Sequence, residues 1–283
     1  MTPNPNFGTL YIVATPIGNL SDMTTHAIDC LKSVSIIACE DTRTSGKLLG
    51  HYDIDTPTWA YHDHNAEVQT PKFIEILQTG QNIALISDAG TPLISDPGFR
   101  LVRACHEHAI KVSPIVGACA AIAGLSVAGL PSDKFYFYGF LPAKTHGRKA
   151  ELDSVKDMTA TLIFYEAPHR IIDSIDDMIA VFGGERAVTF CREISKTFET
   201  IHHATLTELK AFVANDSNQQ RGEMVLVVAG TSKAVDNETK HDDLLKRLLQ
   251  DLSVKKSAQL ASDITGAKKN ALYDRALFLS ENS

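Results

Sequence analysis

Short apolar runs alternate with amphipathic stretches through the first 115 residues, and this alternation limits the possible fold more than any other feature. The apolar runs cover residues 10–14, 34–39, 83–86 and 111–115. Stretches with helical spacing of apolar residues separate them, at residues 24–32, 66–77 and 100–108. Continuously apolar strands joined by helices are typical of a mainly parallel sheet that is covered on both faces. The first part of the chain is therefore predicted to be an α/β domain.

A second α/β series begins after residues 130–133. We expect its strands at residues 135–140, 160–165, 187–191 and 224–229, and its helices at residues 171–182 and 206–214. Beyond Gly230 the polar segment 233–240 is typical of a linker. Leucines then recur at helical spacing, and Ser253 is a candidate cap for a further helix. We predict two α/β/α domains, at residues 1–131 and 132–232, followed by a linker and a small helical tail at 233–283.

Several common function classes lack their sequence signatures here. The chain has no Walker A loop, no GxGxxG after its first predicted strand and no GxSxG elbow. This disfavours nucleoside triphosphate and dinucleotide binding, the commonest methyltransferase fold and serine hydrolase chemistry. The five cysteines are scattered and form no CxxC pair, which argues against a disulfide framework or a zinc site.

Charge and hydropathy limit the expected location and partners. The N-terminus has no signal-peptide pattern and no apolar run reaches about 18 residues, so we expect a cytoplasmic protein without membrane contact. A net charge of −7 disfavours nonspecific nucleic-acid binding. Basic residues nevertheless gather at 144–149 and within 253–279. These segments are compatible with a specific RNA target, and equally with solvated helix faces.

The loop at residues 87–98 follows the apolar run 83–86 and reads SDAGTPLISDPG. Ligands bind at the carboxyl ends of strands in open α/β sheets, which is where this loop is predicted to lie. Asp88 offers a carboxylate to hydroxyl or amino groups, and Ala89 and Gly90 allow close approach of the backbone. The alternative is an ordinary turn rich in structure breakers. We predict a ligand-binding loop.

Six segments, taken in order, resemble a known family. They are residues 12–20 (IVATPIGNL), 39–44 (CEDTRT), 87–98, 128–133 (AGLPSD), 164–170 (FYEAPHR) and 222–225 (GEMV). Together they resemble the ribosomal RNA small subunit methyltransferase I family, which comprises cytidine 2′-O-methyltransferases of the tetrapyrrole methylase superfamily. The resemblance extends over about residues 8 to 280.

The resemblance implies S-adenosylmethionine as methyl donor, bound in a cleft between the two α/β domains, and a homodimer. It implies as substrate the ribose 2′-hydroxyl of a cytidine in the decoding region of 16S rRNA in the small ribosomal subunit. The positions that match the family's donor site are Pro16, Asp88, Ala89, Gly90, Thr91, Ile94, Ser95, Cys119, Ala120, Tyr165, Glu166, Glu223 and Met224. Members of that family usually carry Pro-Gly-Pro before a Cys-Ala or Ser-Ala pair, where this chain has Val116, Gly117 and Ala118. The loss of both prolines loosens that turn.

Methylation of a hydroxyl requires alignment and a group that accepts or polarises the hydroxyl proton, and needs no metal. Asp41 and Arg43 follow one predicted strand, and His62 and Asn65 follow the short run 59–61, so we predict these four as catalytic candidates. The alternative for the first pair is a helix N-cap with a surface ion pair, and for the second a polar loop. Zinc binding by His62 and His64 is disfavoured because no third ligand is suitably spaced.

Candidate RNA contacts come from the segments 144–149 and 165–170 and from the C-terminal tail. Residues 165–170 leave a strand and open a helix with Pro168 in its first turn, so that helix terminus is suited to an anion. We expect Arg170 and the pair Arg192-Glu193 to contact the donor or the RNA backbone. The alternative for them is an ion pair within the domain. The tail either docks on RNA or packs its helices together through Leu272, Leu277 and Phe278. The predicted RNA-contacting residues are Lys144, Arg148, Lys149, Arg170, Lys268 and Lys269.

Two other functions stay open. One is a tetrapyrrole C-methylase, against which the basic helical tail and the segments at 40–43 and 165–170 argue. The other is a noncatalytic RNA-binding protein of ribosome assembly, against which the intact loop at 87–98 argues. Saturable donor binding distinguishes the enzymes from the binding protein.

Overall fold

The computed structural model describes residues 2–231 and 241–281, so the predicted linker at 233–240 lies outside the described residues. The chain forms two compact units by its internal contacts. The first combines residues 1–154 with 160–229 and holds two sheets. The second combines residues 155–159 with 230–283 and holds the C-terminal helices. No helix in the described part of the chain has the length and apolarity needed to cross a membrane.

The first sheet is parallel throughout, as predicted, with strand order β3-β2-β4-β1-β5. Its strands are β1 (Thr9–Val13), β2 (Ile36–Cys39), β3 (Thr58–Ala60), β4 (Ile83–Ile86) and β5 (Lys111–Ile115). The three-residue β3 at the sheet edge was not predicted. Because all five strands run in one direction, all five carboxyl ends lie at one edge of the sheet.

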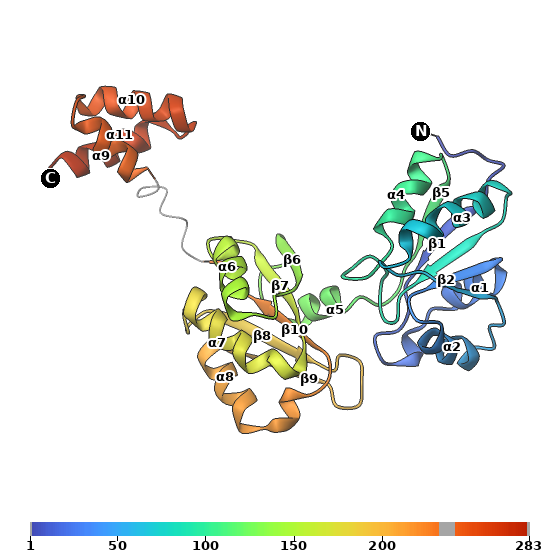
Figure 1. Ribbon diagram of the computed structural model, residues 1–283. Helices are drawn as coiled ribbons and strands as arrows, with labels where there is room; N and C mark the ends of the chain where they lie inside the picture. The colour runs from blue at the N-terminus through green and yellow to red at the C-terminus, as the bar shows by residue number, and fades with distance from the viewer. Residues whose placement is uncertain (1, 232–240, 282–283) are drawn as a thin grey trace. The chain divides into compact units, whose positions relative to one another are not determined.

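Helices cover both faces of this sheet (Figure 1). Ile83 and Leu85 of β4 pack with α3 (Ala66–Gln78) and α4 (Phe99–Glu107). Ala84 and Ile86 point to the other face, where α1 (Thr25–Ser33) and α2 (Thr42–His51) lie. Every residue of β4 is buried, which explains why this strand reads as a continuous apolar run.

The second sheet is mixed, with order β6-β7-β10-β8-β9. Its strands are β6 (Phe135–Phe140), β7 (Thr161–Glu166), β8 (Ala187–Arg192), β9 (Thr200–Thr205) and β10 (Met224–Val228). β6 and β7 are parallel, and the other neighbours are antiparallel. Four of these strands were predicted. β9 was not predicted because it is a partly exposed edge strand, and its polar sequence, TIHHAT, does not form an apolar run.

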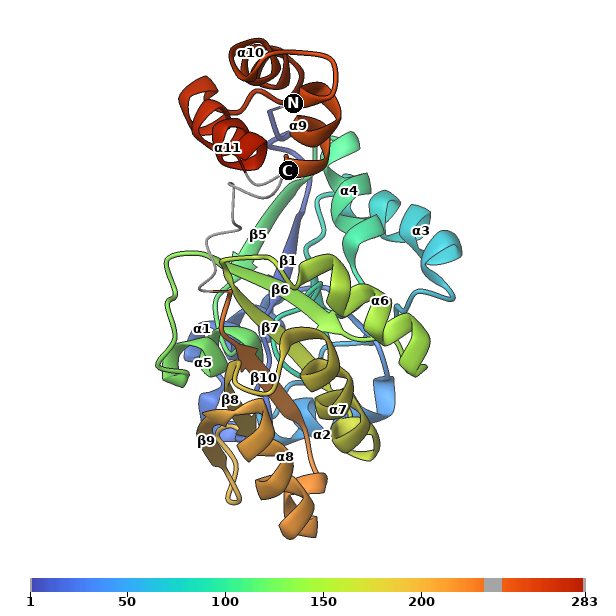
Figure 2. The ribbon, with the colours of Figure 1, turned by 90° about the vertical axis from the view of Figure 1, so that its left-hand side faces the viewer.

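Helices α6 (Thr145–Val155), α7 (Ile171–Phe182) and α8 (Leu206–Asn215) accompany this second sheet. Helix α5 (Ala120–Val127) packs on it through Ala121 and Leu125, opposite α6 and α7 (Figure 2). Short 3₁₀ turns complete the first unit: η1 (Leu20–Asp22), η2 (Pro168–Arg170) and η3 (Ser217–Gln220). Pro168 takes the first position of η2, as predicted. The domain boundaries at 131 and 232 stay predictions.

The second unit contains the helices α9 (Asp242–Leu249), α10 (Val254–Thr265) and α11 (Lys269–Glu281). Their apolar faces meet around Leu245, Ala258 and Leu272. Asp242 of α9 is held by Arg275 of α11 through two hydrogen bonds, of 2.8 and 2.6 Å. Ser253 is the N-cap of α10, as predicted, although its side chain makes no capping hydrogen bond.

Candidate functional site

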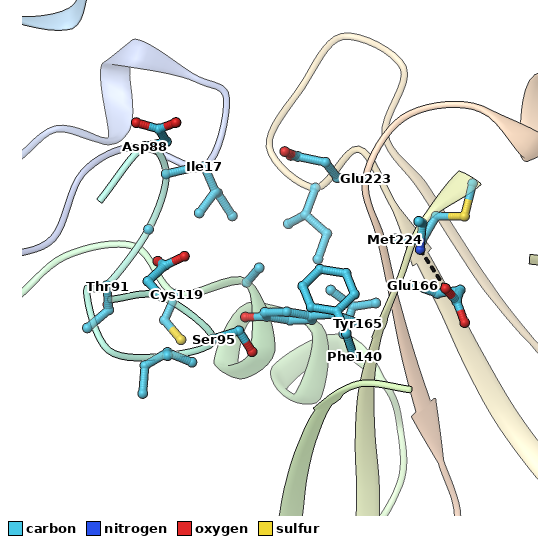
Figure 3. Close-up of a pocket in the computed structure, with 18 of the residues that line it drawn as sticks. Ile17, Asp88, Thr91, Ser95, Cys119, Phe140, Tyr165, Glu166, Glu223 and Met224 are labelled. Atoms are coloured by element: carbon cyan, nitrogen blue, oxygen red, sulfur yellow. Dashed lines mark hydrogen bonds between the residues drawn. The ribbon is translucent and has the colours of Figure 1, made fainter. Parts of the chain in front are cut away.

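The candidate site is a cavity of about 390 Å³ within the first unit, between the carboxyl ends of the first sheet and one end of the second (Figure 3). We call it the main cavity. The loop after β4, the start of α5, the ends of β6 and β7 and the start of β10 supply its walls. It is lined by Ile17, Asp88, Ala89, Gly90, Thr91, Ile94, Ser95, Asp96, Cys119, Ala120, Phe140, Tyr165, Glu166, Ala167, Pro168, Ile194, Glu223, Met224 and Val225.

Every residue matched to the family's donor site lines this cavity except Pro16. Pro16 lines a second cavity beside it. Sequence reasoning missed Ile17, Asp96, Phe140, Ala167, Pro168, Ile194 and Val225. Most of these residues lie close to a predicted position, so the strand ends that indicated the predicted residues could also have indicated these. Phe140 is the exception, because it ends a strand for which no site residue was proposed.

The loop after β4 is fastened to the end of β1. The Thr15 N–H donates to the Gly90 carbonyl at 2.8 Å, and the Gly90 N–H donates back to the Thr15 carbonyl at 3.1 Å. Gly90 has φ +79°, and a Cβ there would lie 3.3 Å from the Ile17 side chain. Glycine therefore suits both the backbone conformation and the close approach of the two loops.

Two non-glycine residues of the same loop, Leu93 and Ser95, have φ of 74° and 68°. Such left-handed conformations cost free energy and persist only where the surroundings enforce them. Here the Ser95 hydroxyl lies against Gly139, where a Cβ would approach it to 2.9 Å. The strand register of β6 shifts at the same place, between Phe137 and Gly139. The next residue, Phe140, lines the cavity with its ring 5.5 Å from that of Tyr165.

The turn before α5 is firmly held, although Val116 and Ala118 stand where the resemblance led us to expect prolines. A Cβ on Gly117 would lie 2.8 Å from the Ala14 Cβ, so glycine is required for this close packing. The Thr91 hydroxyl donates to the Ala118 carbonyl at 2.9 Å. The Ala121 N–H donates to the Tyr165 hydroxyl at 3.1 Å. Burial raises the pKa of Tyr165, so its hydroxyl is neutral at physiological pH.

The lining side chains give the main cavity a negative character. Among the described residues that line it are four carboxylates, Asp88, Asp96, Glu166 and Glu223, and no basic side chain. Burial, together with the charge of Asp88, raises the pKa of Asp96 despite a hydrogen bond with Ser87. Burial and the same Asp88 charge also raise the pKa of the neighbouring Glu40. An arrangement in which carboxylates repel each other favours a bound cation.

Glu166 is already committed to partners inside the protein. Its carboxylate accepts from the Ala167 N–H at 2.7 Å, from Arg170 Nε at 2.9 Å and from the Ser174 hydroxyl. Arg170, a predicted RNA contact, thus forms the intradomain ion pair that was its alternative. Arg192 is likewise buried, where its guanidinium donates to Gln219 and to backbone carbonyls.

Asp41 and Arg43 form the N-cap and surface ion pair that was their alternative. Asp41 accepts from the Arg43 N–H at 2.8 Å, and their side chains pair at 3.1 Å. The hydrogen bonds from Arg43 lower the pKa of Asp41, which makes it a weaker base. Neither lines the main cavity, but the Asp41 N–H lies 3.4 Å from Asp88 Oδ1, so Asp41 reaches the site through Asp88.

His62 and Asn65 lie at the end of β3, beside the end of β2. The His62 N–H donates to Asn65 Oδ1 at 2.9 Å, and Asn65 Nδ2 donates to the Ala60 carbonyl at 3.0 Å. These bonds form the polar loop that was the alternative interpretation. Neither residue lines the main cavity. Within residues 2–231 and 241–281 no three histidine, cysteine or acidic side chains are arranged to hold a metal ion.

The predicted RNA contacts differ in accessibility. Lys144, Lys149, Lys268 and Lys269 are exposed. Arg148 is buried instead, with Nε 2.6 Å from Asp177 Oδ2. An arginine that is 1 % exposed and fully paired has no group left for a phosphate, so we withdraw Arg148 from the candidate RNA contacts.

Comparisons with known proteins indicate the same family that the six sequence segments resemble. The family described as Tetrapyrrole (Corrin/Porphyrin) Methylases matches residues 9–210, and the RsmI C-terminal HTH domain matches residues 235–280. Ribosomal RNA small subunit methyltransferase I of Pseudomonas aeruginosa is 54% identical over 273 residues, which cover 95% of this chain and 97% of that protein. The protein of the same name from Haemophilus influenzae is 50% identical, covering 95% and 96%.

Solved structures share the fold at low identity. Uroporphyrin-III-C-methyltransferase from Thermus thermophilus has a TM-score of 0.56 at 16% identity, covering 78% of this chain and 94% of that one. A diphthine synthase has a TM-score of 0.58 at 12% identity, covering 78% and 89%.

Proposed function

This chain belongs to the ribosomal RNA small subunit methyltransferase I family of the tetrapyrrole methylases, and we propose that it methylates the ribose 2′-hydroxyl of a cytidine in the decoding region of 16S rRNA. We propose S-adenosylmethionine as the donor, bound in the main cavity. One observation carries the proposal: the loop 87–98, matched to the family's donor loop, forms one wall of a cavity whose charged lining residues are all acidic.

The residues of the main cavity fit this donor. Its sulfonium and ammonium groups are cations, which the carboxylates Asp88 and Asp96 favour, whereas Glu223 is paired with Lys196. Its carboxylate suits the first turn of α5, because Cys119 caps that helix without a side-chain hydrogen bond and leaves backbone N–H groups available besides that of Ala121, which donates to Tyr165. The adenine ring suits apolar walls of the kind that Ile94 and Ile194 provide.

When bound, S-adenosylmethionine supplies a methyl group activated by its positive sulfur. The protein must then align the acceptor hydroxyl and remove its proton. We assign the proton-accepting role to Asp88, a carboxylate of the cavity wall that is exposed to substrate. Asp41 and Arg43 act as positioning residues, because the Asp41 N–H is directed at Asp88 Oδ1. His62 and Asn65 stay proposed as catalytic candidates.

For RNA we retain Lys144, Lys149, Lys268 and Lys269, which are exposed to phosphates, although the Lys149 ammonium also lies 3.5 Å from Asp177 Oδ1. The match of the tail to an HTH domain supports its use in nucleic-acid binding. Arg170 keeps at most a secondary role because Glu166 neutralises it. We also propose a homodimer, a cytoplasmic location and 16S rRNA of the small ribosomal subunit as the acceptor.

The test is methyl transfer from labelled S-adenosylmethionine to small ribosomal subunits from cells that lack the gene, with the modified nucleotide mapped. Label on a cytidine ribose in the decoding region is the expected result. Donor binding, measured by calorimetry, accompanies it. Bound donor with label only on a tetrapyrrole would replace the proposal by the C-methylase alternative, and absence of donor binding would leave the noncatalytic RNA-binding protein.

A further inference from the structure

A second cavity, of about 340 Å³, adjoins the main cavity. The two share part of their lining: Ile17, Asp88, Ala89 and Glu223. The remaining walls are the turn after β1, one face of α2 and the loop between β8 and β9. They comprise Pro16, Gly18, Leu20, Thr44, Lys47, Leu48 and Lys196. No position of this second cavity other than Pro16, Asp88, Ala89 and Glu223 was matched to the donor site.

The wall formed by the second sheet is rigidly built around Lys196. Its Nζ lies 2.8 Å from both Glu193 Oε1 and Glu223 Oε2, so the ammonium charge is matched inside the protein. A Cβ on Gly18, whose φ is +132°, would overlap the methylene chain of Lys196. A Cβ on Gly222, whose φ is +79°, would overlap the Glu193 carboxylate. Two glycines therefore accommodate this lysine and its partner.

The opposite wall presents a different lysine. Thr44, Lys47 and Leu48 share one face of α2, because residues three and four apart lie next to each other on a helix. Lys47 is exposed and makes no ion pair with any residue of the described chain, so its charge is available to a ligand. Leu48 and Leu20 add apolar surface beside it.

We propose that the second cavity is the acceptor subsite, and that it takes one nucleotide unit of an RNA chain with a backbone phosphate on Lys47. This inference rests on the proposed function. The acceptor hydroxyl must meet the donor directly, and the second cavity shares the Asp88 wall with the main cavity. Apolar side chains next to one uncompensated cation match a nucleotide, which has an apolar base face and an anionic phosphate.

The test compares Lys47→Gln with Lys72→Gln. Lys72 is an exposed lysine of α3, on the other face of the first sheet, and it lines neither cavity. Binding of S-adenosylhomocysteine is measured by calorimetry, and kcat and KM for small subunits are measured at several salt concentrations. For Lys47→Gln we expect unchanged donor affinity, a KM raised about tenfold and a salt dependence whose slope falls by about one. Lys47→Arg should restore most of the loss.

Equal KM values and equal salt slopes for Lys47→Gln and Lys72→Gln would overturn the acceptor subsite. Loss of donor affinity in Lys47→Gln would also overturn it, because the lysine would then belong to the donor site. Failure of the proposed function is recognised separately, in the wild-type protein, as absent donor binding or absent label on ribosomal RNA. A wild-type enzyme that methylates only a tetrapyrrole would overturn both.

Discussion

Arg148 Nε lies 2.6 Å from Asp177 Oδ2, and both side chains are almost completely buried between α6 and α7. The guanidinium also donates to the Ala143 carbonyl and the Thr145 hydroxyl. Lys149, the next residue, reaches the second oxygen of Asp177 at 3.5 Å from the protein surface. An arginine predicted to contact RNA thus ties the start of α6 to α7.

We predict that Arg148→Met lowers the free energy of unfolding by about 3 to 5 kcal/mol, because it leaves Asp177 buried with only a distant partner. Circular dichroism during urea denaturation measures the change. The control is Arg103→Met, which breaks an exposed pair with Glu107 and is expected to cost at most about 1 kcal/mol. Equal effects of the two substitutions would show that Arg148 does not stabilise the fold through Asp177.

The sequence contained a signal for the burial of Arg148. Leu152 and Val155 follow it at intervals of four and seven residues and are also buried, so all three share one face of α6. The basic residues of the segment 144–149 were interpreted together as exposed, because runs of charged residues usually are, and the burial of Arg148 was therefore not predicted. Helical spacing places the arginine among the apolar residues and Lys149 outside them.

Strand ends and apolar runs allowed most of the fold and the main cavity to be predicted. β4 and α7 are the clearest cases, since β4 is a short apolar run followed by a turn-rich loop and α7 is a strongly amphipathic helix. The sequence does not indicate which strand ends of the first sheet lie against which strand ends of the second, because this depends on long-range packing. Phe140 reaches the cavity only through the register shift at Gly139, and the second cavity depends on contacts between residues nearly 180 positions apart.

Gly18→Ala should impair the wall between the two cavities. An added Cβ would displace Lys196 from its bridge between Glu193 and Glu223, so we expect kcat/KM to fall at least tenfold. Gly129→Ala is the matched control, because Gly129 also has positive φ but a Cβ there meets no atom within 4 Å. That control should cost about 1 kcal/mol of stability and leave activity unchanged. Steady-state methyl transfer and thermal unfolding measure both, and a fully active Gly18→Ala enzyme would refute the role of this contact.

Tyr165→Phe should weaken donor binding. The substitution removes the hydroxyl that accepts the Ala121 N–H and so loosens the first turn of α5 at the main cavity. We expect the affinity for S-adenosylhomocysteine to fall about tenfold, as for the loss of one partly buried hydrogen bond. Tyr136→Phe, at an exposed tyrosine of the neighbouring β6, should bind like wild type. Calorimetric titration distinguishes the two, and wild-type affinity in Tyr165→Phe would show that this hydrogen bond does not shape the donor site.

The stability of the helical tail should depend on pH through the ionisation of Asp242. Hydrogen bonds from Arg275 lower the pKa of Asp242 below its usual value of 3.8. A carboxyl whose pKa is lower in the folded protein stabilises the fold above its unfolded pKa, and the stabilisation is lost as pH falls through the folded value. We therefore expect Asp242→Asn to cost about 1 kcal/mol from about pH 5 to 8, and progressively less below about pH 4.

Hydrogen exchange of α9 and α11, followed by mass spectrometry in the full chain, measures this difference locally. Asp243→Asn is the matched control, since Asp243 is exposed, shares the first turn of α9 and forms no ion pair with a residue in the described part of the chain. Both aspartates favour the helix N-terminus equally through their charge. A protection loss in Asp242→Asn that exceeds that of Asp243→Asn at pH 7 and vanishes near pH 3 assigns the effect to the pair with Arg275. Equal losses at every pH would instead leave only the charge at the helix end.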